Sequence, residues 1–267
     1  MHRLLHPATR LELDEGSCAF VLMAKAPRVG AVKTRLAPLL SAEEAAELSR
    51  SFIRDMSANI AELIGTRPDL GVVAFAPAGD EAAFAGLLPE AFCLLPQRGA
   101  DLGERLQNVS EDLLAAGFGA VCMINSDSPT LPAAYLRESA ALLRMPGDRV
   151  VLGAADDGGY YLIGLKHPHR HLFHRIDWST ERVFAQSVER AATIGLEVAR
   201  LPPWYDVDDA ASLRRLCREL MESQDPMNRH ASGYAADNTA RFLRSLMEQN
   251  RDLRVLIAPA PPAMRLA

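Results

Sequence analysis

Short apolar runs of strand length alternate with longer segments of helical periodicity, and this alternation constrains the fold more than any other feature of the chain. Strands are predicted at about 18–24, 71–76, 92–95, 120–125, 149–155, 160–165 and 196–201. Helices are predicted at about 41–64, 101–116, 132–144, 180–193, 209–223 and 236–250, with a short helix starting near 80. This order is typical of a doubly wound α/β domain, in which helices cover both faces of a mostly parallel sheet.

One strand of the sheet is expected to run against the others. Only a glycine-rich turn separates the apolar runs at 149–155 and 160–165. A parallel connection needs a crossover of a dozen or more residues, so these two strands should be antiparallel or bend away from each other.

The chain is long enough to bury a large core, with 267 residues of which 49% are hydrophobic. We predict a main domain over 18–222, preceded by an N-terminal leader at 1–17. A partly helical C-terminal extension, turn-rich at its start and rich in proline and alanine at its end, is predicted over 223–267.

Composition excludes several classes of protein. A formal net charge of −5 without a long basic tract argues against nucleic acid as a partner. No apolar stretch is long enough to span a membrane, and the first residues lack the apolar core of a secretory signal. The four cysteines occur singly, which favours reduced core residues in a cytoplasmic protein over a disulfide framework or zinc site, although a pairing in space stays open. The oligomeric state is not indicated. The cysteines are Cys18, Cys93, Cys122 and Cys217.

A basic loop follows the first predicted strand. Gly30 allows the backbone to approach a ligand closely, and cations at the carboxyl end of a strand suit phosphate oxygens. The alternative is a solvated loop with no ligand. A Walker A loop is excluded because Ala31 and Val32 separate Gly30 from Lys33. The cations of the loop are Lys25, Arg28, Lys33 and Arg35.

Three groups of acids are candidates for chemistry. Asp127 follows the strand at 120–125 and could hold Mg²⁺ or Mn²⁺ against a diphosphate, or could instead cap the next helix. Asp157 could accept a proton from an acceptor, while Gly158 and Gly159 leave room for a sugar or base. A plain Asp-Gly turn explains the same residues.

A third acidic group precedes the helix at 209–223. Asp206 and Asp208 lie two residues apart and share a face of an extended segment, so either could be a second metal ligand. Asp208 or Asp209 is expected to cap the helix. Two further capping boxes are predicted at Ser41 with Glu44 and at Asp101 with Glu104, and the residues just before Asp101 could bring a loop into the cleft. The histidines of the segment 167–174 favour an exposed turn over a metal site.

Taken together, six ordered motifs between about Cys18 and Leu220 resemble the GT-A-fold nucleotide-diphospho-sugar transferase superfamily. The closest resemblance is to the selenodomain-associated transferases, also called domain of unknown function 2064. The motifs are AKAPRVGAVKTRLAP (24–38), QRGADLGERL (97–106), NSDSPTLP (125–132), DGGYYLIGL (157–165), IDWST (176–180) and YDVDD (205–209).

This resemblance implies a Rossmann-like GT-A fold, in which the first loop holds a nucleotide. The predicted nucleotide-binding residues are Lys25, Ala26, Pro27, Gly30, Lys33, Arg35, Ser126, Gly158 and Gly159. The predicted catalytic residues are Asp127, Lys33, Arg35 and Asp157, and the predicted ligands of Mg²⁺ or Mn²⁺ are Asp127, Asp206 and Asp208.

Three functions follow from these expectations. The first is a metal-dependent glycosyltransferase that passes a sugar from a nucleotide-diphospho-sugar to a small-molecule acceptor. The second is a nucleotidyltransferase that joins a nucleoside triphosphate to a phosphorylated acceptor and releases pyrophosphate. It is suggested because Asp127 stands alone between Ser126 and Ser128, whereas many sugar transferases carry Asp-x-Asp, and a lone acid resembles the guanylyltransferases of the same superfamily. The third is a nucleotide-binding protein without turnover.

Overall fold

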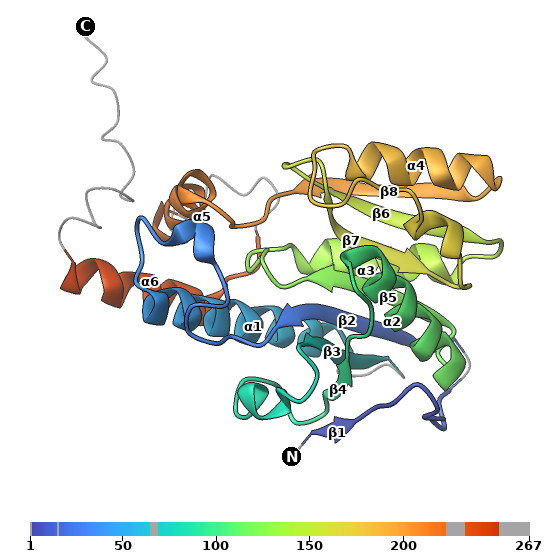
Figure 1. The fold of residues 1–267 in the computed structure, drawn as a ribbon, viewed down its shortest axis with the longest axis horizontal. Helices are drawn as coiled ribbons and strands as arrows, with labels where there is room; N and C mark the ends of the chain where they lie inside the picture. Colours follow the sequence, from blue (N-terminus) through green and yellow to red (C-terminus); the bar gives the residue numbers. More distant parts are fainter. Residues whose placement is uncertain (1, 15, 65–68, 223–232, 251–267) are drawn as a thin grey trace, which may run out of the picture.

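The computed structural model describes residues 2–14, 16–64, 69–222 and 233–250, and it forms a mixed eight-stranded sheet with helices on both faces (Figure 1). Predictions that concern 223–232 and 251–267 lie outside the described residues. The strands, in their order across the sheet, are β1 (Arg3–Leu4), β4 (Cys93–Pro96), β3 (Leu70–Ala76), β2 (Cys18–Lys25), β5 (Ala120–Asn125), β7 (Tyr160–Leu165), β6 (Arg149–Ala155) and β8 (Glu197–Trp204).

The predicted fold class is confirmed. At the centre of the sheet, β2 pairs in parallel with both β3 and β5. The reversed strand is β7, which is antiparallel to β5 on one side and to β6 on the other. Because β2 and β5 are parallel neighbours, the loops that leave their carboxyl ends emerge side by side, as ligand-binding loops do in open α/β sheets.

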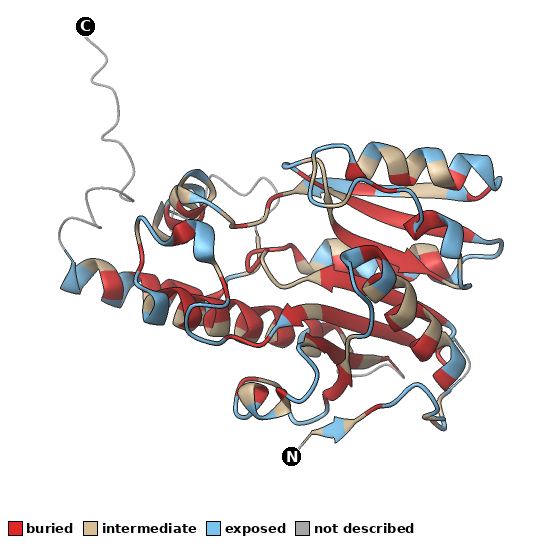
Figure 2. Cartoon of the chain, in the orientation of Figure 1, coloured by how far each residue is buried: buried red, intermediate tan, exposed pale blue. Residues whose placement is uncertain are grey.

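The central strands are buried on both faces because helices cover the sheet on both sides (Figure 2). Phe20 and Val21 are adjacent on β2 and point to opposite faces, and both are fully buried. The helices are α1 (Ala42–Ile64), α2 (Leu102–Ala116), α3 (Ala133–Arg144), α4 (Val183–Thr193), α5 (Ala210–Glu222) and α6 (Asp237–Gln249). Continuous apolar strands are therefore a direct consequence of the layered architecture.

Helix α1 begins where the sequence predicts, because its capping box forms. The Glu44 backbone N–H donates to Ser41 Oγ at 3.2 Å, and the Ser41 N–H donates to the Glu44 carboxylate at 2.7 Å. Asp101 caps α2 in the same way, accepting from the Glu104 N–H at 2.8 Å. The Glu104 carboxylate reaches past the cap residue to the Ala100 N–H.

Some elements differ from the sequence-based expectation. The short helix near 80 is a single 3-10 turn at Glu81–Phe84. The strand predicted at 196–201 continues to Trp204 because it pairs with β6 as far as Ala155. Strand β1, inside the predicted leader, was not expected and adds to the edge of the sheet beside β4. None of the described helices is long and apolar enough to cross a membrane.

The cysteines are reduced core residues, as predicted. All four are free and buried. Cys18 and Cys122 lie on the neighbouring strands β2 and β5, with their sulfur atoms 3.7 Å apart in a thiol hydrogen bond. This hydrogen bond and then burial raise the pKa of the Cys18 thiol, so it is an inert neutral side chain.

Helix α6 packs against α1 and helps to enclose a third apolar cluster with α5. Its first turn is held by Asp55, a carboxylate of α1 that is 1% exposed. Asp55 accepts from the backbone N–H groups of Asn238 and Thr239, at 3.0 and 2.8 Å, and from the Asn238 side chain at 2.8 Å. A buried carboxylate thus satisfies the donors that the start of α6 leaves unpaired.

Replacing Asp55 with alanine should destabilise the fold by about 1–3 kcal/mol, because buried N–H groups of α6 would lose their acceptor. Asp55→Asn keeps one acceptor oxygen and should fall between the wild type and Asp55→Ala. Urea unfolding followed by circular dichroism measures both changes. The exposed Glu43→Ala on the same helix is the control, and equal stability of Asp55→Ala and this control would contradict the capping role.

Candidate nucleotide and metal site

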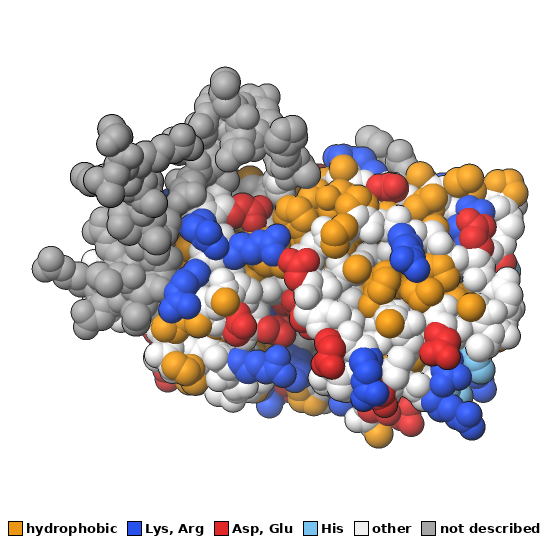
Figure 3. Space-filling model, turned by 90° about the horizontal axis from the view of Figure 1, so that it is seen from above, with side chains coloured by type: hydrophobic (Ala, Val, Ile, Leu, Met, Phe, Trp, Pro, Cys, Tyr) orange, Lys and Arg blue, Asp and Glu red, His pale blue; other side chains and the backbone are white. Residues whose placement is uncertain are grey.

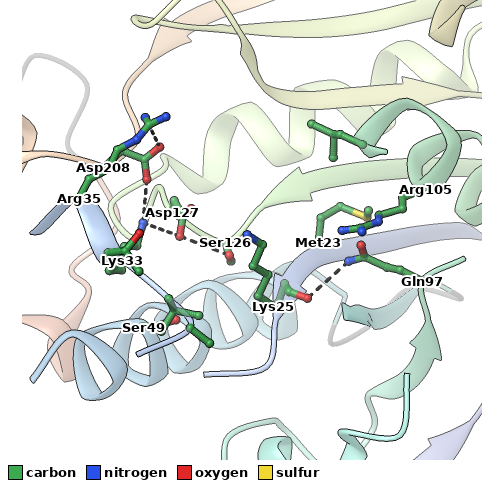
Figure 4. Close-up of a pocket in the computed structure, with 15 residues that line it drawn as sticks. Met23, Lys25, Lys33, Arg35, Ser49, Gln97, Arg105, Ser126, Asp127 and Asp208 are labelled. Atoms are coloured by element: carbon green, nitrogen blue, oxygen red, sulfur yellow. Dashed lines mark hydrogen bonds and ion pairs between the residues drawn. The ribbon is translucent and has the colours of Figure 1, made fainter. Parts of the chain in front are cut away.

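A cavity of about 450 Å³ opens at the carboxyl edge of the sheet, between the loop after β2 and the segments after β4, β5 and β8 (Figure 4). This is the edge where the sequence analysis placed the ligand. Its lining residues are Met23, Ala24, Lys25, Ala31, Val32, Lys33, Thr34, Arg35, Ser49, Gln97, Leu102, Arg105, Ser126, Asp127 and Asp208.

The side chain of Lys33 is only 4% exposed although it borders this cavity. Its ammonium group lies 2.7 Å from Asp127 Oδ1 and 3.1 Å from Asp208 Oδ1, and it also donates to the Val207 carbonyl oxygen at 2.7 Å. The Phe52 ring lies 5.3 Å from the ammonium. A buried ammonium needs such partners, since an unpaired charge of this kind is costly to remove from water.

The chain brings these groups together from three separate places. Lys33 lies in the loop after β2, Asp127 follows β5, and Asp208 lies between β8 and α5. The Val207 N–H donates to the Asp127 carbonyl at 2.9 Å, which fixes the last two segments against each other. Lys33 itself has a left-handed backbone, with φ at 51°, where the loop turns into a 3-10 turn at Thr34–Leu36.

The structure excludes the capping alternative for Asp127 and shows which acid caps α5. Helix α3 begins after Pro132 without a side-chain cap, so the prediction that Asp127 caps a helix is wrong. Asp209 caps α5, because its carboxylate accepts from the Ser212 N–H at 2.8 Å. Asp208 is therefore left to face Lys33.

Other predicted residues of the first loop divide into two groups. Lys25 and Arg35 line the cavity, and Arg35 is 74% exposed, with Nη1 4.0 Å from Asp208 Oδ2. Ala26, Pro27 and Gly30 are not among its lining residues. Arg28 pairs with Asp80 instead.

Asp157 and Asp206 lie at the ends of neighbouring strands. Ala155 and Trp204 are partners across β6 and β8, so the residues two positions further along each chain extend from the same edge. Burial, followed by the charges of Asp157, Asp208 and Asp127, raises the pKa of Asp206 to about 7. The carboxylate of Asp206 therefore interacts electrostatically with those of Asp157, Asp208 and Asp127.

The turn that carries Asp157 has a structural role of its own. Asp157 Oδ1 accepts from the Gly159 N–H at 2.8 Å, as in a tight Asp-Gly turn. Gly158 has φ of 88°, and a Cβ there would lie 2.2 Å from the Glu181 carbonyl oxygen. The 181–184 segment packs so closely against residue 158 that only glycine fits there. Neither glycine lines the cavity described above.

The oxygen atoms around Lys33 suit a hard divalent cation. Two carboxylates and a carbonyl oxygen converge on one point, and Mg²⁺ is commonly held by one or two carboxylates together with substrate phosphates. Within the described ranges, no group of three or more His, Cys, Asp or Glu side chains is arranged to hold a metal by itself. Asp127 and Asp208 therefore fit a metal whose shell the substrate completes.

Several lining residues were not predicted individually. Gln97 follows β4 and donates its side-chain N–H to the Ala74 carbonyl at 2.7 Å, and Arg105 projects from the first turns of α2 (Figure 4). The glycine-containing segment before Asp101 predicts a loop that could enter the cleft, but it does not single out these side chains.

The histidines of 167–174 lie in a turn and in the 3-10 turn Arg170–Phe173, whose Leu172 and Phe173 are buried, and the rings of His167 and His169 meet edge to face with centroids 6.4 Å apart. His169 pairs with Asp148, His171 with Thr193 and His174 with Gln107. On the face seen from above, basic and acidic side chains are mixed in the left half, and no single-sign basic surface appears there (Figure 3).

Residues 61–180 match the family model described as an uncharacterized protein conserved in bacteria, domain of unknown function 2064. This match confirms the predicted family resemblance. No curated protein matches the sequence. Among solved structures, a candidate nucleotide-diphospho-sugar transferase from Desulfovibrio desulfuricans G20 is 28% identical. The comparison covers 88% of this chain and 97% of that one, with a TM-score of 0.73.

A second structure shows the same fold at lower identity. It is CMP:2-keto-3-deoxy-manno-octonic acid synthetase complexed with CTP, which is 13% identical, with 78% of this chain and all of that chain covered and a TM-score of 0.50. The chain is thus similar in fold to both of these structures.

The Asp206 carboxyl predicts a pH-dependent stability. Its pKa in the folded state, about 7, lies above the ordinary value of 3.8, so the folded state binds more protons between these two values. The free energy of unfolding therefore falls as pH rises from about 4 to about 7. In a chelating buffer above pH 7, Asp206→Asn should exceed the wild type in stability by about 1–2 kcal/mol, allowing for solvent screening.

Below pH 4 this difference should vanish, because Asp206 is then neutral in both states. Urea unfolding at a series of pH values measures it, with the exposed Asp14→Asn as the control. A constant difference between Asp206→Asn and wild type across the series would contradict the shifted pKa.

Proposed function

We propose that this protein is a metal-dependent transferase that takes a nucleotide-diphospho-sugar and passes the sugar to a small-molecule acceptor. The observation that carries the proposal is that the carboxylates of Asp127 and Asp208 converge on the Lys33 ammonium. They do so at the wall of a cavity that Lys25 and Arg35 also line. The similarity to the candidate sugar transferase over 88% of the chain supports a donor linked to a nucleotide.

Each charged residue has a role in this scheme. Asp127 and Asp208 would hold Mg²⁺ or Mn²⁺, which when bound neutralises the diphosphate and stabilises it as a leaving group. Lys25 and Arg35 line the cavity and would bring positive charge to the phosphate oxygens. Asp206 interacts electrostatically with both acids, but the described residues hold no group of three acids arranged around one metal, so the scheme leaves Asp206 outside the metal shell.

On the acceptor side, Asp157 is the candidate general base. It is exposed at the end of β6, and its neighbours in the turn hold it in place. A carboxylate there can take the proton of an acceptor hydroxyl as the new bond forms.

A nucleotidyl transfer is the second candidate, favoured by the serines on both sides of Asp127. In that reaction the acceptor phosphate attacks the α-phosphorus of a nucleoside triphosphate, and pyrophosphate leaves. Positioning and neutralisation of charge dominate such chemistry, so the same cations would serve it.

Two measurements separate these reactions. A thermal-shift panel of sugar nucleotides and triphosphates, with and without Mg²⁺ or Mn²⁺, identifies the donor, because a ligand that binds the native state raises the melting temperature. Product assays then detect either a nucleoside diphosphate or pyrophosphate. A panel in which no nucleotide shifts the melting temperature would contradict both candidates.

Asp127→Asn should lower turnover at least about a hundredfold while leaving the fold intact, because a carboxylate that would hold the metal ion against the diphosphate is lost. The measurement is steady-state kinetics with the donor found in the panel. Asp148→Asn is the matched control, since Asp148 precedes β6 at the opposite edge of the sheet and pairs with His169. Full activity of Asp127→Asn would overturn the scheme.

A further inference from the structure

The position that a divalent cation would take is held by a side chain of the protein. Lys33 Nζ lies 2.7 Å from Asp127 Oδ1 and 3.1 Å from Asp208 Oδ1. These are the two carboxylates that fit the metal, and Figure 4 shows both pointing at the same ammonium. The cradle is therefore already neutralised in part by a covalently tethered cation.

An ammonium group and a divalent ion cannot share this cradle. Both would contact the same two oxygens, and like charges a few ångströms apart repel strongly where the surroundings are partly buried. The Val207 carbonyl and the Phe52 ring enclose the ammonium on its other sides. A divalent ion bound to the Oδ1 atoms of both acids would therefore stand against the Lys33 ammonium.

We propose that Lys33 and the divalent metal are alternative occupants of the Asp127–Asp208 cradle, so that metal binding displaces the Lys33 ammonium. This inference rests on the proposed function for the use of a metal, although the exchange itself needs neither donor nor acceptor. Lys33 is thus a positioning residue that keeps the metal-free cradle closed.

Once displaced, the Lys33 side chain can enter the neighbouring cavity. Lys33 lines the cavity together with Lys25 and Arg35, so its stem borders the space that a diphosphate would occupy. If the Lys33 ammonium is released from Asp127 and Asp208, it would no longer be a buried counter-ion and could contact a phosphate. Arg35 cannot serve as the buried counter-ion, because its side chain is 74% exposed and its Nη1 lies 4.0 Å from Asp208 Oδ2.

Binding of Mn²⁺ alone tests the exchange directly. Isothermal titration of Lys33→Met should give at least about tenfold tighter Mn²⁺ binding than the wild type, because the competing cation is gone. Arg35→Met removes the same formal charge from the exposed side and should stay within about threefold of the wild type. Asp127→Asn should lose Mn²⁺ binding, which would show that the ion binds at Asp127.

A second measurement uses the wild-type protein, in case Lys33→Met does not fold. The sequence contains three lysines, Lys25, Lys33 and Lys166, so acetylation at each can be followed by mass spectrometry. Without metal, Lys33 should be protected relative to exposed Lys25. Saturating Mn²⁺ should raise the acetylation of Lys33 toward that of Lys25 and leave Lys166 unchanged.

Two results would overturn the exchange: equal Mn²⁺ affinity in Lys33→Met and Arg35→Met, or Lys33 acetylation that Mn²⁺ leaves unchanged. Neither depends on a nucleotide. If exchange occurs but no nucleotide binds, the proposed function fails alone. If nucleotides bind and turn over but Lys33 stays protected in Mn²⁺, the exchange fails alone.

Discussion

The bridge from Lys33 to two carboxylates is the interaction on which the geometry of the site depends. It joins the loop after β2 to the end of β5 and to the segment before α5, three segments that lie far apart in the sequence. A buried ammonium with two carboxylates and a carbonyl is satisfied, whereas loss of one partner would leave an unpaired charge in a poorly solvated place. The loop is therefore held against the sheet edge by electrostatics, with Phe52 beneath it.

The apolar cluster behind the site explains why the acids point outward. Between β8 and α5 the chain is extended, so alternate side chains face opposite ways. Tyr205 and Val207 are buried in the cluster formed with α5 and α6. Asp206 and Asp208 consequently face the sheet edge. The hydroxyl of Tyr205 bonds Glu219 on α5, which anchors the segment further.

The sequence predicts those structural features that depend on residues close together along the chain. The strands follow from apolar runs buried on both faces, and the helix starts follow from capping residues such as Ser41 and Asp101. That Lys33 and Asp127 meet was expected from their places at strand ends. What could not be predicted was long-range: Asp55 holds Asn238, 183 residues away, and no sequence pattern links them. The choice between a capping and a site role for Asp127 also required the actual start of α3.

The balance of charge gives a physical reason to expect a cation beyond Lys33. Asp127, Asp157, Asp206 and Asp208 interact strongly enough that burial and mutual repulsion raise the pKa of Asp206. Lys33 supplies one positive charge to this group from a buried position, and Arg35 is exposed to solvent. A diphosphate brought to the same edge would add further negative charge to an already acidic group. If a nucleotide donor approaches these carboxylates as proposed, additional positive charge would have to accompany it, and an oxygen-lined cradle favours a divalent ion for that purpose.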